Sequence, residues 1–280
     1  DAAMPAGIDE FADKLEEQVP GSRESTMEVF RLAEKGMKAI AYLSQGKPDP
    51  NVLVSEHADF MRMASHSVDE CLDALGMPKK AQQIISTYWW YLGAPTDQLD
   101  FLHYAFLLYR YVTRGAGMPR YRSHELSLSL EKSIWENGGD IWYNTTVTEL
   151  LVKENQVYGV KIGDKELHSK HVISNAMPNC VFGKMMDTRE IPEQELKVAN
   201  AREFGMSFFT VDLGLNKTAS ELGIEDYAVF LMEDSDSRVQ YEKSFAQNAD
   251  EGFFANCLNK MIPDCTPEGT SMLFFTVCVY

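Results

Sequence analysis

Apolar side chains recur every three or four residues along most of residues 8–112, and this spacing predicts a region built almost entirely of helices. Gly46 and Gly93 mark helix ends, and Pro78 marks a helix start. The most apolar segment, residues 99–112, is shorter than the roughly 18 residues that a membrane span needs. We expect a buried amphipathic helix there, with peripheral contact to a membrane surface as the alternative. The helices are expected within residues 8–19, 25–46, 67–76, 78–93 and 99–112.

The pattern changes near residue 123. One more helical pattern, with Leu126, Leu130 and Ile134 spaced four apart, stops at two glycines, Gly138 and Gly139. We expect these glycines to close the helix in the left-handed conformation and to reverse the chain. Short β-rich runs follow, and they predict a strand, a three-stranded meander and a buried strand ending at a sheet edge, within residues 141–144, 146–153, 156–162, 165–168 and 171–176.

A third region begins near Gly205, where longer strand patterns alternate with polar or helical connections such as residues 236–246. This alternation predicts a mixed sheet. The whole chain is therefore expected to have an α/β fold in three parts. They are a helical lid over residues 1–112, a helix with a β-meander over 113–185, and a mixed-sheet domain over 186–280.

Charge and composition exclude several classes of ligand and catalytic site. The chain has 26 basic and 42 acidic residues, a net charge of -16 that disfavours binding to nucleic acid. Its five cysteines lack C-x-x-C spacing, which favours reduced thiols and a cytoplasmic location. The six histidines lack a metal-binding spacing, and the sequence contains no G-x-S-x-G nucleophile motif. We expect no metal site and no side-chain nucleophile.

Residues 113–185 resemble the FAD-dependent amine-oxidase superfamily, in particular its phytoene desaturase, carotenoid isomerase and retinol saturase branch. In that branch a proline, a basic residue and a small polar residue open a helix that ends in Gly-Gly. A β-meander then leads to a strand end similar to Val-Ile-Ser-Asn-Ala-x-Pro. The matching positions are Pro119, Arg120, Ser123, Leu126, Leu130, Ile134, Gly138, Gly139, Val147, Gly159, Val160, Ser174, Asn175, Ala176 and Pro178. Weaker similarity extends over most of residues 80–215.

The resemblance implies part of a FAD/NAD(P)-binding Rossmann-like domain, beside a substrate domain with a helical lid. It implies FAD as the cofactor of the complete protein. The backbone of Val147 would hold the adenine end, and Ser174, Asn175 and Ala176 would lie near the pyrophosphate and the ribityl chain. A strand edge and the carboxyl end of a sheet are suitable places for a nucleotide.

The resemblance also places Ser123 near the flavin, with Arg120, Tyr121 and Arg122 facing the flavin or the substrate. The implied reaction is oxidation, reduction or isomerisation of C=C bonds in an apolar polyene or lipid. Hydride would pass between the substrate and flavin N5, so the simplest mechanism needs no side-chain base. No catalytic side chain is assigned, and the oligomeric state is left open.

Two features depart from the family pattern. No G-x-G-x-x-G motif follows a strand, and Gly115-Ala116-Gly117 lacks the third glycine, so we expect a loop there. The chain is therefore expected to be an internal portion of a longer flavoenzyme, lacking the amino-terminal Rossmann unit and inactive by itself.

Tyr121 and Arg122 stand where the family usually has two glycines beside the flavin. This substitution favours an alternative function, a non-catalytic module that binds an apolar ligand or a partner. A third hypothesis is amine oxidation, which would require an aromatic cage formed by residues such as Trp89, Trp90 and Tyr121.

Overall fold

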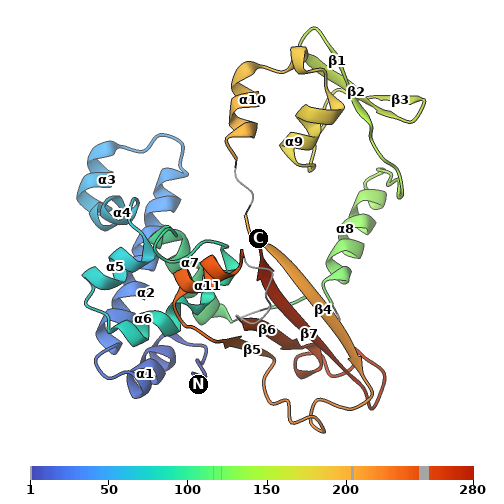
Figure 1. Cartoon of the computed structure of the whole chain (residues 1–280). Helices are drawn as coiled ribbons and strands as arrows, with labels where there is room; N and C mark the ends of the chain where they lie inside the picture. Colours follow the sequence, from blue (N-terminus) through green and yellow to red (C-terminus); the bar gives the residue numbers. More distant parts are fainter. Residues whose placement is uncertain (1, 116, 121, 203–204, 246–251) are drawn as a thin grey trace. The chain divides into compact units, whose positions relative to one another are not determined.

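The computed structural model describes residues 2–115, 117–120, 122–202, 205–245 and 252–280. They form two compact units, and each is described by itself. Unit 1 comprises Asp1–Glu125 and Gly205–Tyr280, and unit 2 comprises Leu126–Phe204. The fold is α/β, with one antiparallel sheet in each unit (Figure 1). The domain limits expected after residues 112 and 185 stay predictions.

The amino-terminal part of unit 1 is helical, as the spacing of apolar residues predicts. Two short helices, α3 and α4, were not expected, because residues 50–63 show no regular apolar period; Asp49 caps the first of them by accepting a hydrogen bond from Asn51 N. The elements are α1 (Ile8–Gln18), α2 (Arg23–Leu43), α3 (Pro50–Glu56), α4 (Ala58–Met63), α5 (Val68–Ala74), α6 (Lys79–Ser86), the 3₁₀ helix η1 (Thr87–Tyr91) and α7 (Phe101–Arg114).

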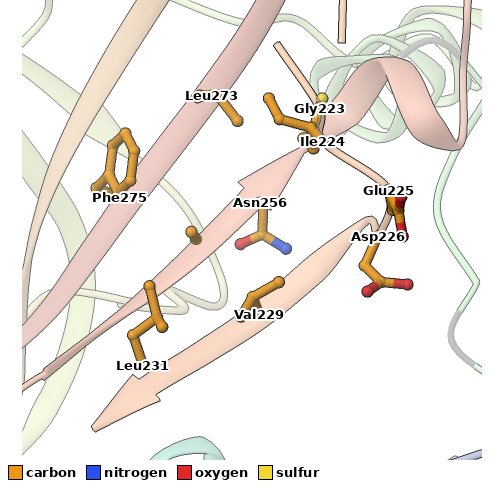
Figure 2. A pocket seen from close by; sticks show the side chains of 11 residues that line it. Gly223, Ile224, Glu225, Asp226, Val229, Leu231, Asn256, Leu273 and Phe275 are labelled. Carbon is orange, nitrogen blue, oxygen red and sulfur yellow. The ribbon is translucent and has the colours of Figure 1, made fainter. Parts of the chain in front are cut away.

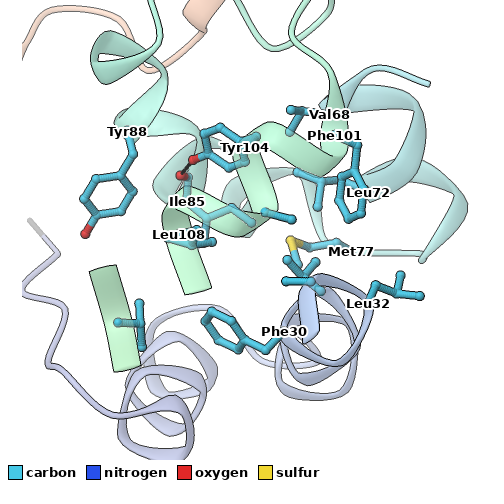
Figure 3. Packing of buried hydrophobic residues seen from close by; sticks show 14 of the residues in the cluster. Phe30, Leu32, Val68, Leu72, Met77, Ile85, Tyr88, Phe101, Tyr104 and Leu108 are labelled. Carbon is cyan, nitrogen blue, oxygen red and sulfur yellow. Dashed lines mark hydrogen bonds between the residues drawn. The ribbon is translucent and has the colours of Figure 1, made fainter. Parts of the chain in front are cut away.

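Helix α7 lies at the centre of the helical core (Figure 3). Phe101, Tyr104 and Leu108 lie on one face of α7 and are at most 1% exposed. Gly36 of α2 lets the two helices approach closely, because a Cβ at this glycine would lie 2.7 Å from Cε1 of Phe106. The expectation of a buried amphipathic helix within residues 99–112 is confirmed. Among the described helices, none combines the length and apolarity needed to cross a bilayer.

The carboxyl-terminal part of unit 1 is a four-stranded sheet in the order β4-β7-β6-β5. Its strands are β4 (Ser207–Leu215), β5 (Ala228–Met232), β6 (Gly252–Cys257) and β7 (Ser271–Val279), with α11 (Ser237–Lys243) between β5 and β6 and the short η5 (Leu258–Lys260) between β6 and β7. Every pair is antiparallel, so the expectation of a mixed sheet is wrong for the described strands. Strand β6 turns back beside β5, β7 turns back beside β6, and the other side of β7 pairs antiparallel with β4, so no two neighbouring strands of the described sheet are parallel.

Unit 2 contains most of α8 (His124–Glu136) and the predicted meander. Its strands β1 (Glu149–Lys153), β2 (Gln156–Ile162) and β3 (Lys165–His168) pair in sequence order, all antiparallel. Short helices follow, namely α9 (Pro178–Cys180), η2 (Val181–Met185), η3 (Thr188–Glu190) and α10 (Glu193–Asn200). Strand β1 contacts η2, and the buried apolar residues described in unit 2 are Leu150, Leu151, Val181, Ile191 and Ala199, all less than 10% exposed.

The glycine pair after α8 behaves as the sequence predicts. Gly138 has φ +77° and donates its N–H to Trp135 O at 3.0 Å. Gly139 donates to Ile134 O at 2.9 Å. These two bonds are those of a Schellman motif, in which a left-handed glycine satisfies the last carbonyls of a helix.

Two predicted strands are absent from unit 2. Residues 141–144 and 171–176 belong to no strand, and Ile173 is 97% exposed. A strand forms only where a neighbour completes its hydrogen-bond ladder, and no described strand pairs with either segment. Helix α8 likewise buries none of its side chains. The prediction of strands there is wrong for this chain, although the apolar pattern that suggested it is present.

Candidate functional site

The residues expected at the nucleotide lie in unit 2, on two exposed or half-exposed segments. Val147 comes just before the meander, whose first described bond joins Thr148 N to Lys161 O at 2.9 Å. Ser174, by its Oγ, accepts a hydrogen bond from Ala176 N at 3.2 Å, so residues 174–176 form a local turn. The backbone at Val147, a hydroxyl and an amide side chain are suitable partners for adenine and ribose, but none of these groups carries a positive charge for a pyrophosphate.

The residues expected nearest the flavin lie in unit 1, before the start of α8. Arg122 and Ser123 are exposed, and Nε of Arg122 lies 3.7 Å from Oε1 of Glu125. Arg120 is exposed as well. Tyr121 lies outside the described residues. The expected site therefore divides between the two units, and its residues stay predictions.

A pocket of about 420 Å³ lies on one face of the unit 1 sheet, and the sequence analysis did not identify it (Figure 2). This volume is within the range of small-molecule sites. Val229 and Leu231 come from β5, and Leu273 and Phe275 come from β7. The loop before β5, residues 223–226, forms the remaining wall.

The strand register explains why this face is hollow. Val229 pairs with Ala255, and Ala255 pairs with Phe275, so a small side chain lies between two larger ones. Successive residues of a strand point to opposite faces, and the odd-numbered residues of all four strands share this face. We call it the pocket face. Its apolar members are Phe209, Val211, Leu213, Leu215, Val229, Leu231, Phe253, Ala255, Cys257, Leu273, Phe275, Val277 and Val279.

The rim of the pocket is acidic. Glu225 and Asp226 are exposed on the loop beside it, and no Lys, Arg or His is among its lining residues. An apolar hollow bordered by carboxylates is suited to an apolar molecule whose polar end donates hydrogen bonds, such as an alcohol. The sequence shows apolar residues at every second position of these strands, such as Val229 with Leu231 and Leu273 with Phe275. The hollow itself depends on how three strands are paired.

The tryptophans considered for an aromatic cage have a structural role. The indoles of Trp89 and Trp90 both donate to Oε1 of Gln240, at 2.9 Å and 2.7 Å. Trp89 is 1% exposed and Trp90 is 7% exposed. Nε2 of Gln240 in turn donates to Asp234 O at 2.5 Å. Gln240 lies on α11, so these hydrogen bonds hold the buried rings of η1 against that helix.

Thiol chemistry is disfavoured at two of the five cysteines. Burial raises the pKa of the Cys71 thiol to about 11 and that of Cys278 to about 12. Both thiols therefore stay protonated near neutral pH, and a protonated thiol is a poor nucleophile. Among the described residues, no three His, Cys, Asp or Glu side chains converge as ligands for a metal ion.

Known sequences similar to the chain include a retinol reductase-like protein and prolycopene isomerases. No family model matches it. It is 26% identical over 84% of its length to the inactive all-trans-retinol 13,14-reductase of Danio rerio, and this match spans 41% of that protein. It is 24% identical over 51% of its length to prolycopene isomerase 2 of an Oncidium hybrid cultivar, and this match spans 23% of that protein. The chain thus spans less than half the length of these relatives.

Solved structures share the fold. An oxidoreductase from Methanosarcina mazei matches 82% of this chain and 50% of its own, with a TM-score of 0.59 and 16% identity. A putrescine oxidase double mutant matches 93% of this chain and 53% of its own, with a TM-score of 0.55 and 14% identity. The matches to a retinol reductase-like protein and to prolycopene isomerases confirm the resemblance to the FAD-dependent amine-oxidase superfamily, and the solved structures show a shared fold.

Proposed function

We propose that this chain is part of a FAD-dependent oxidoreductase that acts on C=C bonds of an apolar polyene or lipid, as a desaturase, saturase or isomerase. The observation that carries the proposal is the sequence match to a retinol reductase-like protein over 84% of the chain. Prolycopene isomerases match part of the same sequence. Retinol and prolycopene are both conjugated polyenes.

The proposal assigns the cofactor to the residues that resemble the family. Val147, Ser174, Asn175 and Ala176 would hold the adenosine and pyrophosphate, and Arg122 would lie on the flavin side. FAD, when bound, supplies the hydride chemistry. The chain would contribute hydrogen bonds at the nucleotide and an apolar surface that excludes water from the reacting bond.

The pocket in unit 1 is the proposed place for the substrate chain. Ala255, between Val229 and Phe275, leaves room for a flat apolar molecule, and the walls are apolar on both flanks. Glu225 and Asp226 would accept a hydrogen bond from a hydroxyl end group and would repel a carboxylate. A polyene alcohol should therefore bind more tightly than the corresponding polyene acid.

The first experiment tests the cofactor. The complete translation product of the gene that encodes this chain is purified, titrated with FAD and measured by visible absorption, beside the 280-residue chain treated in the same way. Bound flavin in the complete product supports the proposal. Folded protein that binds no flavin in either sample contradicts it.

A second experiment tests the substrate site in the 280-residue chain, where no flavin is needed. Binding of retinol and retinoic acid is followed by quenching of tryptophan fluorescence. Ala255→Phe should fill the hollow and abolish retinol binding, whereas Gln98→Leu, on an exposed loop, should not change it. The double substitution Glu225→Gln with Asp226→Asn should reduce the preference for the alcohol. Equal binding of both ligands by the unsubstituted chain would contradict the role of the acidic rim.

A non-catalytic apolar-ligand module is the second candidate function. Arg122 stands where the family usually has a glycine beside the flavin, and the name of the Danio rerio relative describes that protein as inactive. Retinol binding without flavin binding would favour this candidate. The buried Trp89 and Trp90, which are held by Gln240, give no support to an amine-oxidase cage.

A further inference from the structure

Strand β4 is the long outer strand of the unit 1 sheet, and it pairs on one side only. Its nine residues lie beside β7, and no described strand pairs with its other side. Eight of the nine residues, 207–214, are exposed, and Phe208 and Phe209 are 55% and 61% exposed. A long, apolar and unpaired edge is a template for another strand, and proteins usually shorten or cover such edges.

The sequence of β4, SFFTVDLGL, is suited to pairing with itself. Two copies related by a two-fold axis through Val211 would align antiparallel, with all nine residues paired. Phe208 would then lie opposite Gly214 of the second copy, and Phe209 would lie opposite Leu213. In each case, a phenylalanine faces a residue that leaves it room or packs against it.

The charge pattern favours the same register. Asp212 is the charged residue of β4, and centring on Val211 places it opposite Thr210 of the second copy, whose hydroxyl can donate to it. An axis through Asp212 would instead place two carboxylates directly opposite each other, which is destabilising. An axis through Thr210 would leave two residues at the carboxyl end of each strand unpaired.

The backbone is compatible with this register whichever amides point outward. An antiparallel pair centred on a residue matches odd positions with odd positions and even positions with even positions. The outward-pointing N–H and C=O groups of β4 alternate along the strand, so they meet their own counterparts in the second copy in either case. The pocket face would also continue across the axis, because Phe209, Val211 and Leu213 all belong to it.

We propose that the outer edge of β4 is a self-association site, at which two copies of this chain pair antiparallel about Val211 and join their two sheets into one of eight strands. A ladder of nine residues is small beside a standard protein interface, and each copy carries a net charge of -16. The dimer should therefore form in the micromolar range, and it should tighten as salt screens the repulsion between copies. The proposal is independent of flavin binding.

The test begins with sedimentation velocity of the 280-residue chain over a concentration series. A species of twice 31.7 kDa should appear as the concentration rises, at lower concentration in high salt than in low salt. A chain that stays monomeric up to on the order of 100 µM in high salt overturns the proposal.

A matched pair of substitutions tests the surface. Val211 and Val229 are both 39% exposed, lie on opposite outer strands and share the pocket face. Val211→Lys places two like charges opposite each other across the axis and should weaken the dimer at least tenfold. Val229→Lys changes the charge equally and should leave it unchanged. Equal weakening by both overturns the proposal, because it would indicate general repulsion or loss of fold.

A mixing experiment tests the register itself. Val211→Lys and Val211→Glu should each be monomeric alone and should form a heterodimer when mixed, because the introduced charges then attract across the axis. Recovery on mixing also shows that both variants are folded. Folded variants that fail to pair when mixed overturn the register about Val211.

Discussion

The helical core of unit 1 and helix α8 of unit 2 carry similar apolar side chains in very different surroundings. Leu108 of α7 is 1% exposed, whereas Leu130 of α8 is 60% exposed. Both lie in helices of similar length whose carboxyl ends are closed by a hydrogen bond from a glycine N–H. Helix formation thus does not depend on where an apolar stripe is buried, and burial depends on which elements are present to cover it.

The same contrast applies to the strands. The meander of unit 2 forms completely because each strand finds its partner within a few residues. The segment 171–176 has a strand's sequence and no ladder, and Ile173 in its middle is almost fully exposed. A sheet packed beside residues 171–176 and α8 would supply a hydrogen-bond partner for this segment and would bury the apolar side chains of α8. This requirement is consistent with the proposed Rossmann-like domain.

The largest expected difference in stability is between substitutions at Leu108 and at Leu130. Leu108→Ala should lower the free energy of unfolding by about 2–5 kcal/mol, because it leaves a cavity in the helical core. Leu130→Ala should change it by no more than about 0.5 kcal/mol, because the side chain is exposed. Urea denaturation followed by circular dichroism measures both. A loss of stability at Leu130 similar to that at Leu108 would show that α8 is packed in solution.

Loss of the hydrogen bonds between Gln240 and the two tryptophans should give the next largest decrease in the free energy of unfolding. Gln240→Leu keeps the volume of the side chain but leaves the indole N–H groups of Trp89 and Trp90 without an acceptor. Two unsatisfied buried donors cost about 1–3 kcal/mol each, and the apolar surface that leucine buries offsets part of this, so a loss of roughly 2–4 kcal/mol is expected. Gln98→Leu, at an exposed position, is the control. Denaturation followed by tryptophan fluorescence provides the measurement, and no difference between the two variants would contradict the buried role of Gln240.

A smaller effect should mark the end of α8. Gly138→Ala places a Cβ on a residue at φ +77°, which costs about 1 kcal/mol. Gly183→Ala, elsewhere in unit 2, has open space and no positive φ, so it should be neutral. Hydrogen exchange of the α8 amides should be faster in the first variant only. Unchanged exchange would show that the Schellman bonds do not hold the helix end.

The smallest effect concerns pH. Lys35 donates a hydrogen bond to Asp59 at 2.5 Å and lowers the pKa of that carboxyl, tying α2 to α4. A lowered folded-state pKa stabilises the fold above the unfolded value of about 3.9, and this contribution disappears as the pH falls through the folded value. Asp59→Asn should therefore cost about 0.2–1 kcal/mol near neutral pH and nothing in strong acid.

The control for this pH effect is Asp187→Asn in unit 2. Asp187 pairs with Arg189, two residues away, and accepts its backbone N–H, so it joins no separate helices. Arg189 lowers the pKa of Asp187 to about 2, but the pair is exposed and joins residues two apart, so it can also form in the unfolded chain. The pH dependence of global unfolding should therefore change less than for Asp59→Asn. A loss at Asp59 that persists in strong acid would contradict the role of its charge.

The sequence by itself determined the elements that depend on local contacts. The spacing of apolar residues predicted α1, α2, α7 and α8, the turn residues predicted the meander, and Gly138 with Gly139 predicted the helix end. These features need only neighbours within a few residues. The family resemblance was also predictable, because it rests on the same short motifs.

Tertiary structure decided what depends on distant partners. The hollow at Ala255 requires three strands in one register, and the position of Trp89 and Trp90 requires Gln240, about 150 residues away. Strand patterns at residues 141–144 and 171–176 gave no strands, because a ladder needs a partner and the described chain supplies none. Local sequence fixes the backbone's preferences, but pairing and burial depend on long-range contacts that no short pattern records.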